Sequence, residues 1–124
     1  MSICELSKGG DYMDQVFKAL SEEGRLRILS VLFQSELCVC EIEDILQLMQ
    51  SNVSRHLTIL KNAGILKSYK NAQWIYYSIN EEFKRDNGEL YRYLELRLKG
   101  LPTYKIDIER LHKCKEKNLC SLKS

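Results

Sequence analysis

The fold is decided by residues 50–79, which read QSNVSRHLTILKNAGILKSYKNAQWIYYSI. In the first part, apolar residues recur at helical spacing, and Gly64 follows where a left-handed residue commonly ends a helix. The second part switches to two runs of β-branched and aromatic residues, 65–70 and 74–79. The stretch therefore predicts a helix over residues 51–63 that is followed directly by a β-hairpin.

The residues before this stretch predict three more helices. Apolar residues recur at helical spacing over residues 12–20 and 22–33, and again in a third helix that begins near residues 38–40. A short break at residues 48–50 separates this third helix from the helix over 51–63, which is the outline of a helix-turn-helix. The hairpin directly behind it is then a wing.

The residues after the hairpin predict two further helical segments. Asn80 is placed to cap the first, and residues 100–102 separate it from a last amphipathic stretch over 104–117. We therefore expect a mainly α protein with a small β-hairpin (α+β). The chain of 124 residues is expected to form a single winged helix-turn-helix domain over about 12–99, with a short N-terminal arm and a cysteine-bearing C-terminal tail at about 100–124.

Two apolar faces of this domain predict a dimer. One lies on the first helix, and the other is the leucine stripe Leu90, Leu94 and Leu98. A small domain does not cover both faces by itself, so a second copy of the chain is the expected partner.

Composition and charge narrow the function classes. The net charge is only +2, but residues 51–77 contain no acid and carry Arg55, Lys61, Lys67 and Lys70, which favours a surface that meets phosphates. No apolar run approaches the roughly 20 residues that span a bilayer, and the first ten residues lack a signal-peptide pattern, so we expect a cytoplasmic protein without a membrane partner. Phosphate-loop and hydrolase motifs are absent from the sequence, which argues against an enzyme. The remaining alternative to a DNA-binding protein is a protein–protein module on the same scaffold.

The helix over 51–63 carries the expected DNA-reading surface. Val53, Leu57 and Leu60 are expected to point inward, which leaves hydroxyl, amide and basic side chains outward, where a helix enters the major groove. Arg55 has the geometry for a bidentate contact to guanine and Asn52 for one to adenine. The predicted DNA-binding residues on this helix and the wing are Gln50, Ser51, Asn52, Ser54, Arg55, His56, Lys61, Lys70 and Gln73.

Four segments together resemble the ArsR/SmtB family of metal-responsive repressors. Residues 50–66 resemble its recognition helix, residues 36–42 the metal box of its arsenical and cadmium/lead branches, and residues 19–29 and 74–77 its second helix and wing strand. The resemblance implies a homodimer, joined through the first and last helices, that binds an imperfect palindrome in double-stranded DNA and releases it when metal binds. Three residues depart from the family pattern: Gln47 and Ala72, where Gly is usual, and Met49, where Ser is usual.

The five cysteines are the candidate sensing groups: Cys4, Cys38, Cys40, Cys114 and Cys120. Their odd number and a reducing cytoplasm favour thiols over a disulfide framework, and thiolates are the natural ligands of soft ions. Cys38 and Cys40 would lie about 200° apart on a regular helix, so they converge only at a helix start or through a distorted first turn. An ion that holds both would then strain the turn before the recognition helix. The alternative is that both are small, buried and inert.

The arsenical branch that this sequence resembles often adds a third cysteine, where this chain has Glu43. Trivalent arsenic prefers three sulfurs, so we expect the third from Cys120 first, then from Cys114 or Cys4. The resemblance thus implies trivalent arsenic (arsenite) as inducer, with no organic cofactor. Two alternatives stay open: a cadmium or lead sensor, Cd(II)/Pb(II), that recruits Cys4, and a redox sensor in which two of these thiols are oxidised.

Overall fold

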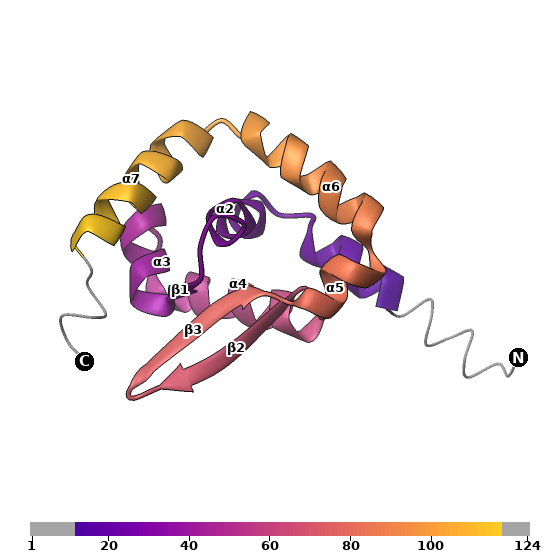
Figure 1. Cartoon of the computed structure of the whole chain (residues 1–124), viewed down its shortest axis with the longest axis horizontal. Coiled ribbons are helices and arrows are strands. Elements are labelled where there is room, and N and C mark those ends of the chain that lie inside the picture. Colours follow the sequence, from indigo (N-terminus) through magenta and orange to yellow (C-terminus); the bar gives the residue numbers. More distant parts are fainter. Residues whose placement is uncertain (1–11, 118–124) are drawn as a thin grey trace, which may run out of the picture.

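The computed structural model describes residues 12–117. It places α2 at the centre, α6 and α7 arching over one side, and a long hairpin projecting on the other (Figure 1). A helix over residues 12–19 precedes the labelled elements. These elements are α2 (Glu23–Leu32), β1 (Leu37–Cys38), α3 (Val39–Leu46), α4 (Gln50–Asn62), β2 (Leu66–Asn71), β3 (Trp74–Ile79), α5 (Glu81–Asp86), α6 (Gly88–Arg97), the 3₁₀ turn η1 (Leu98–Gly100) and α7 (Tyr104–Lys117).

The helix-turn-helix consists of α3 and α4, and the hairpin of β2 and β3 is its wing, so the expected winged helix-turn-helix is confirmed. Gly64 adopts the left-handed conformation (φ 81°) just beyond α4, as its position predicted. Gln47 (φ 55°) and Ala72 (φ 58°), which stand where the family usually has glycine, adopt the same conformation. Both backbones therefore keep the turn although neither residue is a glycine, at a conformational cost that glycine would avoid.

The sheet has a third strand that the sequence pattern did not predict. β1 pairs antiparallel with β3, and Cys38 lies opposite Tyr76. A strand of two residues is too short to show the alternation by which strands are recognised. Through this strand, Cys38 is attached directly to the wing.

The core continues past the domain boundary expected near residue 99. α7 packs against α2 and α3, and it contributes Leu111 and Cys114 to the buried core. Asp107 of α7 is fully buried and accepts two hydrogen bonds from Arg27 of α2, at 2.9 and 3.0 Å. The segment expected as part of a tail is therefore a docked helix of the same domain.

The helix expected after the hairpin divides at Asn87, whose backbone (φ −127°, ψ 45°) is not helical. In α6 and η1, Leu94 and Leu98 are 6% and 4% exposed, so most of the leucine stripe packs within its own chain and not against a partner. The apolar side chains that α6 leaves exposed are Tyr93 and Leu96 instead.

Across residues 12–117, every helix is too short or too polar to cross a membrane.

Candidate nucleic-acid interface and thiol site

The exposed face of α4 carries most of the predicted DNA-reading side chains. Val53, Leu57 and Leu60 are fully buried, as expected. The first turn of α4 has no acid, and its backbone N–H groups are open to an anion because the N-cap, Met49, makes no side-chain hydrogen bond. The predicted residues that are exposed on α4 and the wing are Gln50, Ser51, Asn52, Ser54, Arg55, Lys61, Lys70 and Gln73.

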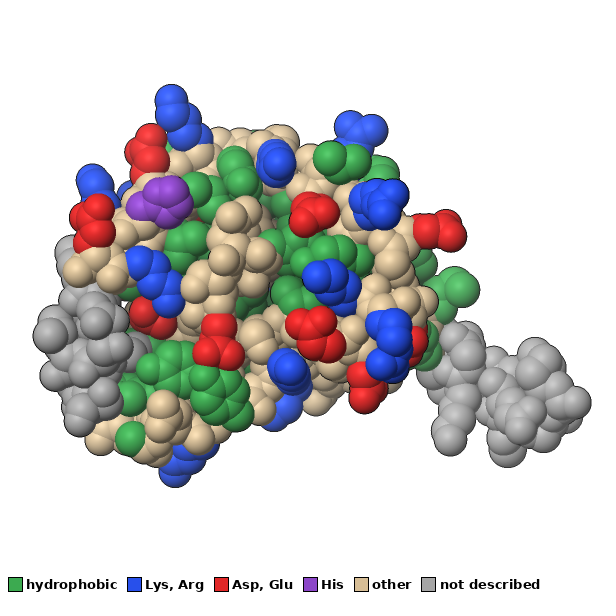
Figure 2. All heavy atoms as spheres, viewed as in Figure 1, with side chains coloured by type: hydrophobic (Ala, Val, Ile, Leu, Met, Phe, Trp, Pro, Cys, Tyr) green, Lys and Arg blue, Asp and Glu red, His purple; other side chains and the backbone are tan. Residues whose placement is uncertain are grey.

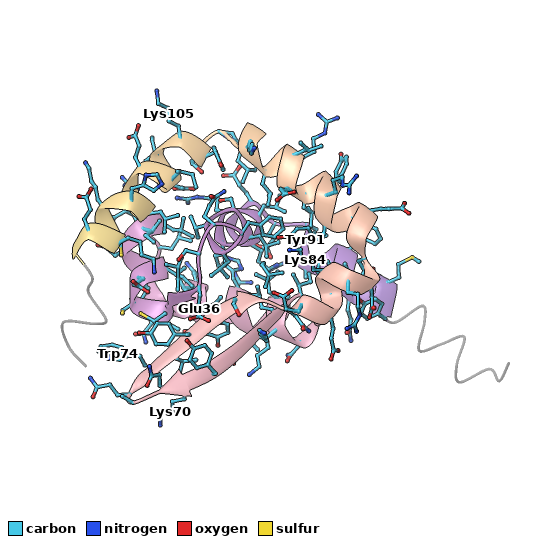
Figure 3. The ribbon with its side chains drawn as sticks, viewed as in Figure 1. Glu36, Lys70, Trp74, Lys84, Tyr91 and Lys105 are labelled. Carbon is cyan, nitrogen blue, oxygen red and sulfur yellow. The ribbon has the colours of Figure 1, made fainter. Side chains whose placement is uncertain are left out.

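Lys70 extends from the outer end of the hairpin, away from the body of the domain, whereas Trp74 turns back toward α3 (Figure 3). Tyr69 and Tyr76 stack on neighbouring strands with ring centroids 5.5 Å apart. The space-filling view shows hydrophobic side chains gathered over the hairpin (Figure 2). The outer part of the wing therefore carries the basic side chain of Lys70 next to the stacked rings of Tyr69 and Tyr76.

His56 was expected to point outward and does not. It is 6% exposed, and its Nδ1 lies 3.1 Å from Nη1 of Arg25, a buried residue of α2. Burial and the neighbouring Arg55 and Arg25 lower the pKa of His56, so the neutral ring that accepts from Arg25 is favoured. The prediction of a DNA contact at His56 is therefore wrong, and the residue instead joins α4 to α2.

Glu22 is a residue of this surface that the sequence analysis missed. Its carboxylate lies 2.8 Å from Nη2 of Arg25 and 3.8 Å from Nη1 of Arg55, so an acid sits beside the principal base-reading candidate. The pairing with Arg25 follows an i,i+3 spacing that could have been read from the sequence. The approach to Arg55 is a tertiary contact without a local signal.

The sulfur atoms of Cys38 and Cys40 are 2.8 Å apart. Cys38 is the N-cap of α3 with extended backbone (φ −87°, ψ 165°), and Cys40 is the second residue of the helix. Because the N-cap is not helical, the angular separation of a regular helix does not apply between these residues. The two cysteine sulfurs therefore meet at an undistorted helix start, and the sulfur of Cys38 is disulfide-bonded in the structure.

A helix start is one of the two arrangements in which the sequence spacing allowed the sulfurs to converge. They already converge without an ion, so an ion need not draw them together. Cys38 is buried and Cys40 is half-buried, so the pair lies just under the surface.

Glu41 and Lys115 hold the thiol pair in place. The backbone N–H of Cys38 donates to Oε1 of Glu41, at 2.9 Å, which fixes the start of α3. Nζ of Lys115 on α7 lies 3.8 Å from Oε2 of Glu41 and donates to the backbone carbonyl of Glu36, at 3.2 Å. The end of α7 is thereby fastened beside the thiols.

The remaining cysteines differ in their suitability as ligands. Cys114 is 1% exposed, and burial together with the nearby Glu41 and Asp44 raises its pKa to about 11, which keeps it a protonated thiol. Cys4 and Cys120 lie outside the described residues. Residues 12–117 contain no group of three or more His, Cys, Asp or Glu side chains that could hold a metal ion. The described part of the chain therefore supplies two sulfurs.

Comparison with known proteins decides the family. A profile described as "Bacterial regulatory protein, arsR family" matches residues 22–68. The chain is 39% identical over 70 residues to the arsenical resistance operon repressor of Bacillus subtilis, and the match covers 56% of this chain and 67% of that protein. The chain belongs to the arsR family. Members of this family are regulatory proteins, which confirms that the chain is not an enzyme.

Two further arsR-family similarities bear on ligand and architecture. The chain is 44% identical over 69 residues to a cadmium resistance transcriptional regulatory protein, a CadC homolog of Staphylococcus aureus, covering 55% of this chain and 57% of that protein. It therefore spans little more than half the length of that relative. A solved winged helix-turn-helix DNA-binding domain, the homodimeric Mb0332 of Mycobacterium bovis, matches with a TM-score of 0.66 at 25% identity, covering 82% of this chain and 94% of that chain.

Proposed function

We propose that the protein is a DNA-binding transcriptional repressor that releases its operator when trivalent arsenic binds Cys38, Cys40 and Cys120. The observation that carries the proposal is the convergence of the Cys38 and Cys40 sulfurs at the junction between the wing sheet and the first helix of the helix-turn-helix. Once Cys38 is reduced, two adjacent cysteine sulfurs are a strong site for a soft, thiol-seeking ion. Similarity to an arsenical resistance repressor supports arsenic as that ion.

The third sulfur is assigned to Cys120 from the reach of the chain. α7 ends at Lys117 beside α3, where Lys115 contacts Glu36 and Glu41. Cys120 follows Lys117 by three residues in the sequence, and three residues of extended chain span at most about 10 Å. Cys114 is disfavoured because its thiol is buried and protonated.

The position of the two thiols supports a coupling to DNA. Cys38 belongs to a strand paired with the wing strand β3, whereas Cys40 belongs to α3, which packs against the recognition helix α4. An ion held by both sulfurs therefore joins the wing sheet directly to α3, and binding displaces one relative to the other. That displacement gives the ion a different affinity for the DNA-bound and released conformations, which the coupling requires.

The operator is proposed to be an imperfect palindrome in double-stranded DNA, read by a homodimer. Met13 and Phe17 on the first helix and Leu96 on α6 are large, exposed apolar side chains, 61%, 57% and 65% exposed. A second copy of the chain is the partner that covers them. A monomeric mass in sedimentation at micromolar concentration would contradict both the dimer and the reading of a palindrome.

The central experiment measures operator release by fluorescence anisotropy, with the reduced full-length protein on its own promoter. Arsenite is expected to release the wild type. Cys38→Ser and Cys40→Ser are each expected to abolish release while leaving DNA binding intact, and Cys120→Ser to weaken it strongly. Cys114→Ser is the matched control and should respond like the wild type. X-ray absorption at the arsenic edge counts the sulfurs. If the double variant Cys38→Ser/Cys40→Ser still leaves its operator on arsenite, the proposal fails.

A cadmium or lead sensor on the same fold is the second candidate, favoured by the similarity to a cadmium resistance regulator. The same anisotropy titration with Cd(II) and Pb(II) separates the two. A response to these ions at lower concentration than to arsenite, lost in Cys4→Ser, would establish the second candidate in place of the first.

A further inference from the structure

An acid lies beside the recognition helix, although residues 51–77 contain none. The tertiary structure brings Glu22 there, with its Oε2 3.8 Å from Nη1 of Arg55. Among the basic side chains of residues 51–77, Arg55 is the one that forms an ion pair with the described part of the chain. The principal candidate for reading bases is thus the one that has a carboxylate beside it.

A buried arginine keeps this carboxylate at the surface. Glu22 is the N-cap of α2, and its Oε2 lies 2.8 Å from Nη2 of Arg25. Arg25 is 4% exposed, and its Nε donates to the backbone carbonyl of Ala19, at 2.7 Å. The side chains of Glu22 and Arg55, in contrast, are both about half exposed. An approaching DNA strand therefore meets the carboxylate of Glu22 next to Arg55, with Arg25 underneath.

We propose that Glu22 is a specificity-determining residue, which weakens the attraction of Arg55 for DNA phosphates and leaves its base-reading donors available. The inference rests on the proposed function, because it takes Arg55 as a contact to a base. It adds to the DNA-reading set a residue outside the helix-turn-helix and the wing. Glu22 acts through Arg55 and is therefore a positioning residue, which need not touch DNA itself.

On random DNA, Glu22 opposes the contact that Arg55 would make. Binding without a sequence match comes from basic side chains that neutralise phosphates and release counterions. The carboxylate of Glu22 has the same sign of charge as a phosphate, and at 3.8 Å it already neutralises part of the charge of Arg55. A phosphate therefore gains less attraction from Arg55 than from an arginine without an acid beside it.

On the operator, Glu22 opposes the contact of Arg55 much less. Guanine presents the neutral acceptors O6 and N7, and a bidentate contact uses two N–H groups on one edge of the guanidinium. Glu22 faces Nη1 of Arg55, so the edge formed by Nε and Nη2 stays available. Because the carboxylate also restricts the guanidinium, less side-chain freedom is lost when Arg55 meets the base. The result is a larger ratio of operator affinity to random affinity, which decides occupancy when non-specific sites are in large excess.

The test measures the affinity of the reduced full-length protein for its own promoter duplex and for a random duplex of the same length, by fluorescence anisotropy without added metal. Glu22→Gln removes the charge and keeps an oxygen that can accept from Arg25. This variant is expected to tighten binding to random DNA about fivefold and to tighten operator binding less, so that the ratio of the two affinities falls. The salt slope on random DNA should steepen by about one, as for one more phosphate contact.

Glu23→Gln is the matched control. Glu23 is the next residue and is also exposed, and within residues 12–117 it forms no ion pair, so this variant removes the same charge without the contact. It should keep the wild-type ratio of affinities. The double variant Glu22→Gln/Arg55→Ala should show the same ratio as Arg55→Ala alone, because no guanidinium remains for Glu22 to act on. Circular dichroism verifies that the variants fold.

Several outcomes would overturn this role of Glu22 while the proposed function stands. Weaker binding of Glu22→Gln to both duplexes, or an unchanged ratio, would mean that Glu22 only supports the fold around Arg25. An equal fall of the ratio in Glu23→Gln would assign the effect to net charge, and an equal fall in the Arg55→Ala background would assign it to direct repulsion of DNA. If the wild type does not prefer its promoter to the random duplex, the proposed function itself fails, and the role of Glu22 fails with it.

Discussion

Helix α2 directs two arginines, Arg25 and Arg27, to opposite parts of the molecule, and the two are held differently. Arg27 donates to both oxygens of the buried Asp107 on α7 and to the carbonyl of Leu46 at the end of α3. This is a charge-assisted bidentate pair, and the hydrogen bond to Asp107 raises the pKa of Arg27. It fixes α7 against α2 and the end of α3.

Arg25 is held by weaker and more changeable partners. It donates to the backbone carbonyls of Ala19 and Lys18, lies 3.1 Å from Nδ1 of His56, and shares the half-exposed Glu22 with Arg55. An imidazole that takes up a proton no longer accepts a hydrogen bond from Arg25, whereas the Arg27–Asp107 pair contains no imidazole. Helix α7, beside Cys38 and Cys40, is therefore held by a buried ion pair. The recognition helix α4 is instead held against α2 by the contact between His56 and Arg25, which we call the adjustable contact.

The largest expected effect comes from removing the fixed contact. Asp107→Ala leaves Arg27 without its buried partner and should lower the free energy of unfolding by about 3–5 kcal/mol. Urea denaturation measures this loss. Glu109→Ala, an exposed acid on the same helix, is the control and should stay within about 0.5 kcal/mol of the wild type. Equal stability of the two variants would show that the Arg27–Asp107 pair does not anchor α7.

Arg55→Ala tests whether the DNA-reading surface is separable from the Arg25 network beneath it. Loss of a bidentate base contact should weaken operator binding by about 1–3 kcal/mol. The unfolding free energy should stay nearly unchanged, because Arg25 keeps Glu22 at 2.8 Å. Fluorescence anisotropy on operator and random duplexes measures the affinity. Unchanged affinity would remove Arg55 from the interface.

Lys70→Ala on the wing is the matched comparison for Arg55→Ala. Lys70 is exposed at the outer end of the hairpin, where a phosphate contact is expected. Its loss should weaken all sequences about equally and reduce the salt slope of binding by about one. An altered sequence preference would instead place Lys70 against a base.

Substitutions at two glycines, Gly24 and Gly88, test through protein stability how tightly His56 is held. A Cβ at Gly24 would lie 2.7 Å from Nε2 of His56, whereas a Cβ at Gly88 meets nothing within 4 Å. Gly88→Ala should therefore stabilise the fold by about 0.4–1 kcal/mol through the unfolded state. Gly24→Ala should destabilise it by about 1–2 kcal/mol, because the ring must shift away from Arg25. Thermal denaturation of the two variants side by side decides the matter, and stabilisation by both would show that the His56 contact is loose.

The same residues show how far sequence reasoning reached. The helices and the wing were predictable because their apolar periods, 3.6 and 2, differ over long stretches. The prediction for His56 is wrong although the sequence carries a signal: Val53, His56, Leu57 and Leu60 follow the i, i+3, i+4, i+7 pattern of one helical face. The partner that allows a polar ring to be buried on that face, Arg25, lies 31 positions earlier, so no local pattern indicates it.

The thiol site was predictable in composition and not in geometry. The Cys-x-Cys spacing and the family resemblance marked Cys38 and Cys40. Their convergence depends on the N-cap conformation of Cys38 and on its pairing with Tyr76, and a strand of two residues carries no periodic signal.

The smallest expected effect is the pH dependence of the adjustable contact. The pKa of His56 in the folded protein lies below its ordinary value of 6.5, so above pH 6.5 the ring is neutral in both states and stability is complete. As the pH falls below 6.5, the unfolded chain takes up the proton first, and the unfolding free energy decreases until the lowered pKa is passed. His56→Gln, which still accepts from Arg25, should remove this slope, and His112→Gln, an exposed control, should retain it. Urea denaturation between about pH 5 and 7.5 measures the difference. Identical slopes for the wild type and His56→Gln would mean that Arg25 does not depend on a neutral His56, and the contrast with Arg27 would then lie in burial alone.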